Sequence, residues 1–141
     1  VAVDASKSAT VTTVKVLDGD VWLGENTTVT TVYATGGTIR QQCASTTTEI
    51  NGATVRTVGT GTIGTLNVYS GLARPDSTGT ITTANLYGGT IDASLSKASR
   101  TITTLNVLGQ SSGDLRTDPD GVTISTLNLP SDRAFSFSVT S

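Results

Sequence analysis

The stretch Ile81-Thr-Thr-Ala-Asn-Leu-Tyr-Gly-Gly-Thr-Ile91 decides the fold, because variants of it recur along the whole chain. Its opening six-residue block returns at Val11–Val16, Val29–Ala34, Ile63–Val68, Ile102–Val107 and Ile124–Leu129, and a degenerate copy starts at Ser45. The copies start roughly 16–22 residues apart, and self-similarity at a period of this length is the sequence signature of a solenoid. The sequence therefore predicts a chain of stacked, equivalent coils.

Each repeat carries aliphatic residues at its first, fourth, sixth and eleventh positions. The step from the fourth to the sixth has a period of two, which is typical of a strand. A pair such as Gly88-Gly89 then lets the chain turn a corner. We predict an all-β, single-stranded parallel β-solenoid with about seven rungs of roughly 16–22 residues. A right-handed coil is favoured, since no aliphatic residue recurs strictly at every sixth position.

The repeat divides the chain into three parts. Residues 1–9 are expected to form an N-terminal arm, residues 10–130 the solenoid and residues 131–141 a capping strand or tail. Within the solenoid, the register of residues 41–60 is the least defined. Ser45 and Thr48 occupy inward positions there, and the segment 55–58 imitates the start of a rung out of phase.

Stacked coils place equivalent residues above one another. We expect the threonine hydroxyls of the third position to bond from rung to rung, and the amides of the later fifth positions to form a second ladder. Both ladders are predicted to serve stacking. The third position reads Thr13, Thr31, Thr47, Thr65, Thr83, Thr104 and Thr126; the fifth reads Lys15, Tyr33, Glu49, Asn67, Asn85, Asn106 and Asn128.

The seventh position is the candidate interface. It follows an inward residue at a corner, so Tyr69, Tyr87 and Leu108 should form an exposed apolar stripe. The stripe is expected to serve lateral self-association or partner docking, and simple aromatic stacking on the rod is the alternative. Trp22 should also point outward, between the inward Val21 and Leu23. It is either part of a cap or an interface anchor.

Residues for catalysis are missing from the sequence. The chain has no histidine, and its single cysteine, Cys43, is read as a buried thiol. The acidic pairs Asp18 with Asp20 and Asp118 with Asp120 lie in turn-like sequence. We therefore expect a non-enzymatic protein with no catalytic residue, no cofactor and no metal site.

Charge and hydropathy limit the partners. The net charge is −2, and the nine basic residues are scattered singly along the chain, so neither nucleic acid nor an anionic membrane is expected as a partner. The Gly-rich segment Gly59–Gly64 lacks the Lys-Ser/Thr ending of a phosphate loop. No run is long enough for a membrane span, and the start of the chain has no signal-peptide core, so synthesis in the cytoplasm is expected.

Three rungs, Ile63–Tyr69, Ile81–Asp92 and Ile102–Val107, resemble the repeats of short β-helical virion proteins of tailed bacteriophages, which are head decoration, spike or fibre components. The resemblance extends over roughly residues 10–130. It implies a homotrimer fixed to a capsid or tail, without catalytic function. The leading hypothesis is a capsid decoration protein of the virion, held to the phage head by residues 1–9 or by the Trp22 end.

Two other functions stay open. In a phage adhesin that binds, or less favourably cleaves, host polysaccharide, Tyr69, Tyr87 and Asp92 would line a sugar groove. The ranked threonines also suggest an ice-binding solenoid, which needs two ranks of threonine on one flat face. The fifth position, taken as the companion rank, is irregular and partly charged, and this weighs against ice binding.

Overall fold

The computed structural model describes residues 8–96, 99–114 and 121–130. The predicted capping strand, most of the predicted arm, and Asp118 and Asp120 lie outside these residues.

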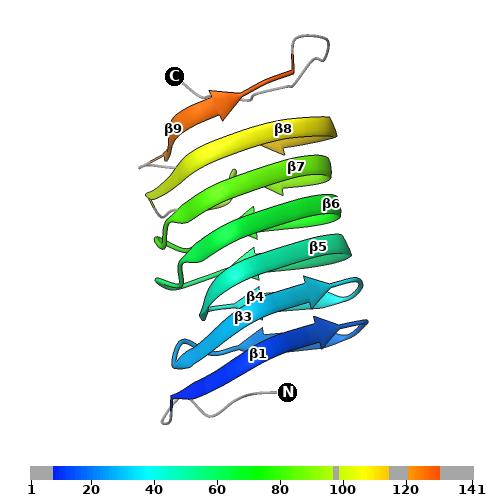
Figure 1. Ribbon diagram of the computed structural model, residues 1–141, viewed down its shortest axis with the longest axis vertical. Coiled ribbons are helices and arrows are strands. Elements are labelled where there is room, and N and C mark those ends of the chain that lie inside the picture. The colour runs from blue at the N-terminus through cyan, green and yellow to red at the C-terminus, as the bar shows by residue number, and fades with distance from the viewer. Residues whose placement is uncertain (1–7, 97–98, 115–120, 131–141) are drawn as a thin grey trace.

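Nine strands and no helix make up the described residues, and all of the strand pairs are parallel. The main stack has the order β1-β3-β5-β6-β7-β8-β9, so that about six full coils separate the first strand from the last (Figure 1). The predicted parallel β-solenoid is confirmed. The strands are β1 (Ala9–Val16), β2 (Asp20–Leu23), β3 (Thr27–Ala34), β4 (Thr38–Gln41), β5 (Ala44–Thr57), β6 (Ile63–Pro75), β7 (Ile81–Asp92), β8 (Arg100–Asp114) and β9 (Val122–Asn128).

The pairing follows the repeat rung by rung, including the degenerate third one. Ser45 lies between Val29 of β3 and Ile63 of β6, in the column of first-position residues. Val55 instead pairs with Ile39 and Ala73, so it belongs to the second half of its coil and starts no rung. The register of residues 41–60 is thereby settled by the neighbours above and below.

The core is a narrow column of aliphatic side chains between the two halves of each coil. The β-branched residues suit these inward positions because they fit a pleated surface that is buried on one side. The largest fully buried apolar side chains are Ile39, Ile50, Ile63, Leu66, Ile81, Leu86, Ile91, Ile102 and Leu105.

A polar cluster sits inside this core at the degenerate rung. The side chains of Gln41, Ser45 and Thr48 are buried and form a closed triangle of hydrogen bonds. The side-chain nitrogen of Gln41 donates to the Ser45 hydroxyl over 2.9 Å, and the hydroxyls of Ser45 and Thr48 lie 2.9 Å apart. The Thr48 hydroxyl donates to the side-chain oxygen of Gln41, Oε1, over 3.2 Å. Polar side chains are tolerated in this core because they satisfy one another.

We predict that Thr48→Val destabilises the fold by about 1–3 kcal/mol, because it keeps the shape of the side chain but leaves the Gln41 carbonyl oxygen without its donor. Urea unfolding measures the change. Thr46→Val, on the exposed side of the same strand, is the control and should stay within about 0.5 kcal/mol of the parent. Equal stabilities of the Thr48 variant and the parent would contradict the role of the triangle.

The corners depend on glycine where successive coils touch. Gly37 has a φ of 71°, and a Cβ atom on it would overlap the carbonyl oxygen of Gly19 in the coil below. Gly19 has a similar φ of 84°, but nothing lies within 4 Å of the place where its Cβ would be. Residue 37 must be glycine both for its backbone conformation and because it lies so close to the next coil. Residue 19 must be glycine for its conformation alone.

This pair yields a second prediction. Gly19→Ala should cost about 1–2 kcal/mol, the penalty of a left-handed alanine, and Gly37→Ala should cost clearly more because the coils must also separate. The measurement is thermal and urea unfolding of both variants. Indistinguishable losses would mean that the contact between the coils imposes no constraint.

Candidate interaction surfaces

The stacking turns each outward sequence position into a column on the surface. At the corner after the first half of the coils, the rings of Tyr69 and Tyr87 stack with their centroids 4.8 Å apart and their planes at 10°. Their exposed fractions are 42% and 43%, and Leu108, at the same corner of the next coil, is 50% exposed. The register shifts here, from Leu86 paired with Val107 to Gly88 paired with Gln110. We call Tyr69, Tyr87 and Leu108 the corner stripe. Because the facing sides of the two rings cover each other, ring edges and hydroxyls make up much of its accessible surface.

The same corner is apolar again nearer the N-terminal end of the stack. Leu17 is 75% exposed, and Lys15, Leu17, Tyr33 and Thr35 line a hollow of about 330 Å³. The Lys15 ammonium lies 5.8 Å from the centre of the Tyr33 ring. Asn51, which accepts a hydrogen bond from Ser70, occupies the corner in the coil between this hollow and the stripe. The apolar surface therefore consists of two separate parts.

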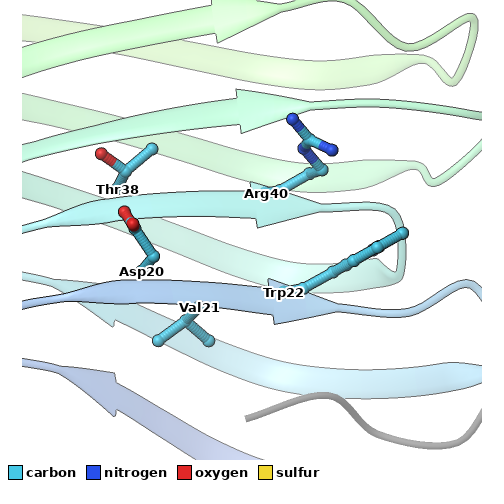
Figure 2. Close-up of a pocket in the computed structure, with 5 residues that line it drawn as sticks. All are labelled: Asp20, Val21, Trp22, Thr38 and Arg40. Atoms are coloured by element: carbon cyan, nitrogen blue, oxygen red, sulfur yellow. The ribbon is translucent and has the colours of Figure 1, made fainter.

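Trp22 lies on a different face of the solenoid. It points outward from β2, with Leu23 buried beside it, and is 49% exposed. The Arg40 guanidinium of the next coil lies 5.6 Å from the centre of the indole ring. Figure 2 shows both side chains at one end of a hollow of about 330 Å³, whose lining is completed by Asp20, Thr38 and Val21.

Three arginines stack into one column above Trp22, a feature that the sequence analysis missed. Arg40 pairs in register with Arg56, and Arg56 with Arg74. Arg56 forms an ion pair with Asp76, and Arg74 forms one with Asp92 at 3.3 Å. Arg40 has no ion pair among the residues that the structure describes. Basic residues that are scattered along the chain are thus gathered by the fold, and aligning the second halves of the repeats could have revealed the column.

Asp92 is already engaged by neighbours. It accepts hydrogen bonds from the backbone and the hydroxyl of Ser94, at 2.9 and 2.6 Å, besides its contact with Arg74. Burial by itself raises the pKa of Asp92, but the Ser94 hydrogen bonds and the Arg74 charge outweigh it, and the pKa lies below its ordinary value. In the sugar groove hypothesised for Tyr69, Tyr87 and Asp92, the two rings are thus already stacked on each other, and the carboxylate already accepts three hydrogen bonds.

The two predicted ladders behave differently. Asn85 donates to Asn67 over 2.9 Å, Asn106 to Asn85 over 2.7 Å and Asn128 to Asn106 over 2.7 Å. The third-position threonines also stand in register, yet no hydrogen bond between their hydroxyls is found in the described parts of the chain. An amide carries both a donor nitrogen and an acceptor oxygen, so each asparagine bonds to the coil above and the coil below. Hydroxyls of neighbouring coils meet elsewhere, as those of Thr90 and Ser112 do over 2.9 Å, but the third-position threonines do not. The third-position threonines are therefore stacked as predicted, but the expected bonds between their hydroxyls are not found in the described residues.

The candidate reactive groups are held in structural roles. Cys43 is buried, and burial raises the pKa of its thiol to about 11. Asp18 accepts a hydrogen bond from the backbone of Gly19 in the turn between β1 and β2. The described residues contain no group of three His, Cys, Asp or Glu side chains that could hold a metal ion, and no helix that could cross a membrane.

Arg100 is the one basic side chain in the described residues that is buried. It is 2% exposed, and its terminal nitrogen lies 3.4 Å from the Ser96 hydroxyl. Burial lowers the pKa of its guanidinium to about 10, and the charge of Asp76 opposes this shift.

Comparison of the chain with protein-family models, with curated proteins and with solved structures finds no match. The surfaces described above are therefore the basis for any functional assignment.

Proposed function

We propose that the chain is a non-enzymatic structural protein that associates laterally with copies of itself through the corner stripe. The supporting observation is the stacked, half-exposed pair Tyr69 and Tyr87, with the exposed Leu108 at the same corner of the next coil. Grouped aromatic and aliphatic side chains on a polar protein are typical of interface centres. Stacking also holds the rings in place, so little side-chain entropy remains to be lost on association.

The thin core gives association a second rationale. Each coil contributes only a few buried side chains, and proteins with small cores gain stability when copies bury surface against one another. The hollow between Leu17 and Tyr33 offers room for a side chain of a neighbouring copy. We propose a homotrimer, because the resemblance to β-helical virion repeats implies that state.

The same resemblance supports an assignment to a particle. We propose that the assembled rods decorate the capsid of a tailed bacteriophage, with a capsid protein as the partner and the virion as the location. The presence of the chain among the proteins of purified virions is the direct test of this part, and its absence from them would remove it.

For self-association, we predict that Tyr87→Glu raises the dissociation constant of the assembly at least about tenfold, the equivalent of about 1.4 kcal/mol, because a charge replaces an aromatic anchor. Sedimentation equilibrium measures the constant, and circular dichroism should show unchanged β content because the side chain lies outside the core.

Thr103→Glu is the matched control. It adds the same charge at an exposed position on another column of the solenoid and should leave association unchanged. A parent protein that is a monomer at every accessible concentration would refute the proposed assembly. Equal weakening by both substitutions would refute the specific role of the stripe.

The Trp22 hollow favours a second candidate function, the binding of a host polysaccharide. It combines an exposed indole, a carboxylate and a hydroxyl with a guanidinium that has no ion pair in the part of the chain that the structure describes (Figure 2). These groups suit the apolar face and the polar groups of a sugar ring. Arg40 would bind a carboxylate on the sugar with its two-pronged edge. The fitting ligand class is an oligosaccharide of uronic acids.

This candidate predicts that uronic-acid oligosaccharides bind the protein and that Trp22→Ala lowers their affinity at least about tenfold through the loss of ring contact. Isothermal calorimetry with polygalacturonate fragments measures binding. Tyr87→Glu is the control and should bind as the parent does. Absence of binding by the parent, or full binding by the Trp22 variant, would eliminate this site.

A further inference from the structure

The strands of the main stack present two regular columns of threonine on their outer side. They flank the inward first-position residue of each coil, so their members lie two residues apart on the same side of the strand. We call the two columns the threonine face. The column before the inward residue holds Thr10, Thr28, Ala44, Thr62, Thr80, Thr101 and Thr123, and the column after it holds Thr12, Thr30, Thr46, Gly64, Thr82, Thr103 and Ser125.

Register is fixed along both columns. Thr10 pairs with Thr28, and Thr101 pairs with Thr123. Thr12 lies between the pairs that join Val11 to Val29 and Thr13 to Thr31, so its neighbour in the next coil is Thr30. The face is therefore a two-dimensional array, with a repeat of about 4.8 Å along the stack and about 6.6 Å along each strand. Figure 1 shows the stacked strands that carry it.

The array is uncharged and open to solvent. No position in either column is acidic or basic, and nearly all of the threonines are exposed. Within the described residues, none of their side chains forms a hydrogen bond to another protein group. Each hydroxyl can thus both donate a hydrogen bond to, and accept one from, molecules outside the protein.

We propose that the threonine face binds ice. The oxygen atoms of the ice lattice repeat along two directions at distances close to the two spacings of this array, so neighbouring hydroxyls can enter hydrogen bonds with one crystal plane together. The methyl groups between them exclude disordered water, and the branched side chains hold few rotamers, so little entropy is lost on binding.

The composition of the face argues against other occupants. An anionic polymer would need basic side chains, and the columns contain none. A protein partner would need a large apolar or aromatic anchor, and these lie on the corner stripe and at Trp22. The third-position threonines have only the irregular fifth position as a companion rank, which weighs against ice binding there. The fold supplies a different and regular pair of ranks.

Two positions interrupt the array, and they differ in a useful way. Ala44 is partly exposed between Thr28 and the next coil, so a threonine there would complete the first column. Gly64 cannot be filled in the same manner, since its Cβ would lie 2.6 Å from the carbonyl oxygen of Thr46. Ala44→Thr is therefore a substitution that should improve the array.

The test is thermal hysteresis of the purified protein by nanolitre osmometry, together with the shaping of single ice crystals. We expect the parent to lower the freezing point below the melting point and to form faceted crystals. Thr103→Glu, which places a charge in the array, should abolish both effects, while Ala44→Thr should enlarge the hysteresis. Tyr87→Glu lies outside the face and should behave as the parent does.

Circular dichroism of each variant separates loss of binding from loss of fold, and Thr82→Tyr offers an uncharged second substitution in the same column. A folded parent without hysteresis or ice shaping at millimolar concentration would overturn the proposal. So would hysteresis that survives both Thr103→Glu and Thr82→Tyr. Self-association is measured separately, by sedimentation of the Tyr87→Glu variant. A negative result for ice binding therefore does not bear on the proposed assembly.

Discussion

The structure depends on one constraint: each coil hydrogen-bonds in parallel to the coil below, and the strand residues are held over their equivalents except at the register shifts near Asn51 and Gly88. Parallel pairing in fixed register makes a one-residue slip of a strand costly, because in β7 it would turn Ile81, Ala84 and Leu86 out of the core together. The repeat in the sequence is the consequence. Each coil must present the same pattern as its neighbours, since a single coil cannot bury its aliphatic side chains alone.

The degenerate third coil shows how the constraint acts where the pattern weakens. Ser45 and Thr48 keep their inward places although they are polar, because the backbone pairing to β3 and β6 leaves them no other. Their buried hydroxyls find a partner in Gln41, which enters from the second half of the preceding coil. Stacking fixes where these side chains lie, and hydrogen bonding within the core offsets the cost of burying their hydroxyls.

The same stacking produces the functional surfaces. Any side chain that recurs on the outside becomes a column at the spacing of the sheet, and the chemistry of the column follows from the residue type. Stacked Tyr69 and Tyr87 give an apolar ridge, and amides such as Asn85 give a hydrogen-bonded ladder. The threonine face gives an array of hydroxyls that bond no other group of the described residues. A short protein can thus carry several distinct surfaces on one rod, each regular because the scaffold is regular.

Local repetition in the sequence determined the fold class, the strand positions, and the columns at the first, third and fifth positions, because equivalent residues in a solenoid are stacked by definition. The seventh position follows this rule only in part, since Asn51 pairs with Ser70. The outward place of Trp22 followed from strand alternation as well. Only the tertiary structure decided which separate segments meet across the coil. It brought Gln41 to Ser45, aligned Arg40 with Arg56, tied Asp92 to Arg74, and set the threonines on either side of Val11 in register with those around Val29. The variable corner lengths hide these relations in the sequence, since the offset between one coil and the next is fixed by backbone pairing and not by residue spacing.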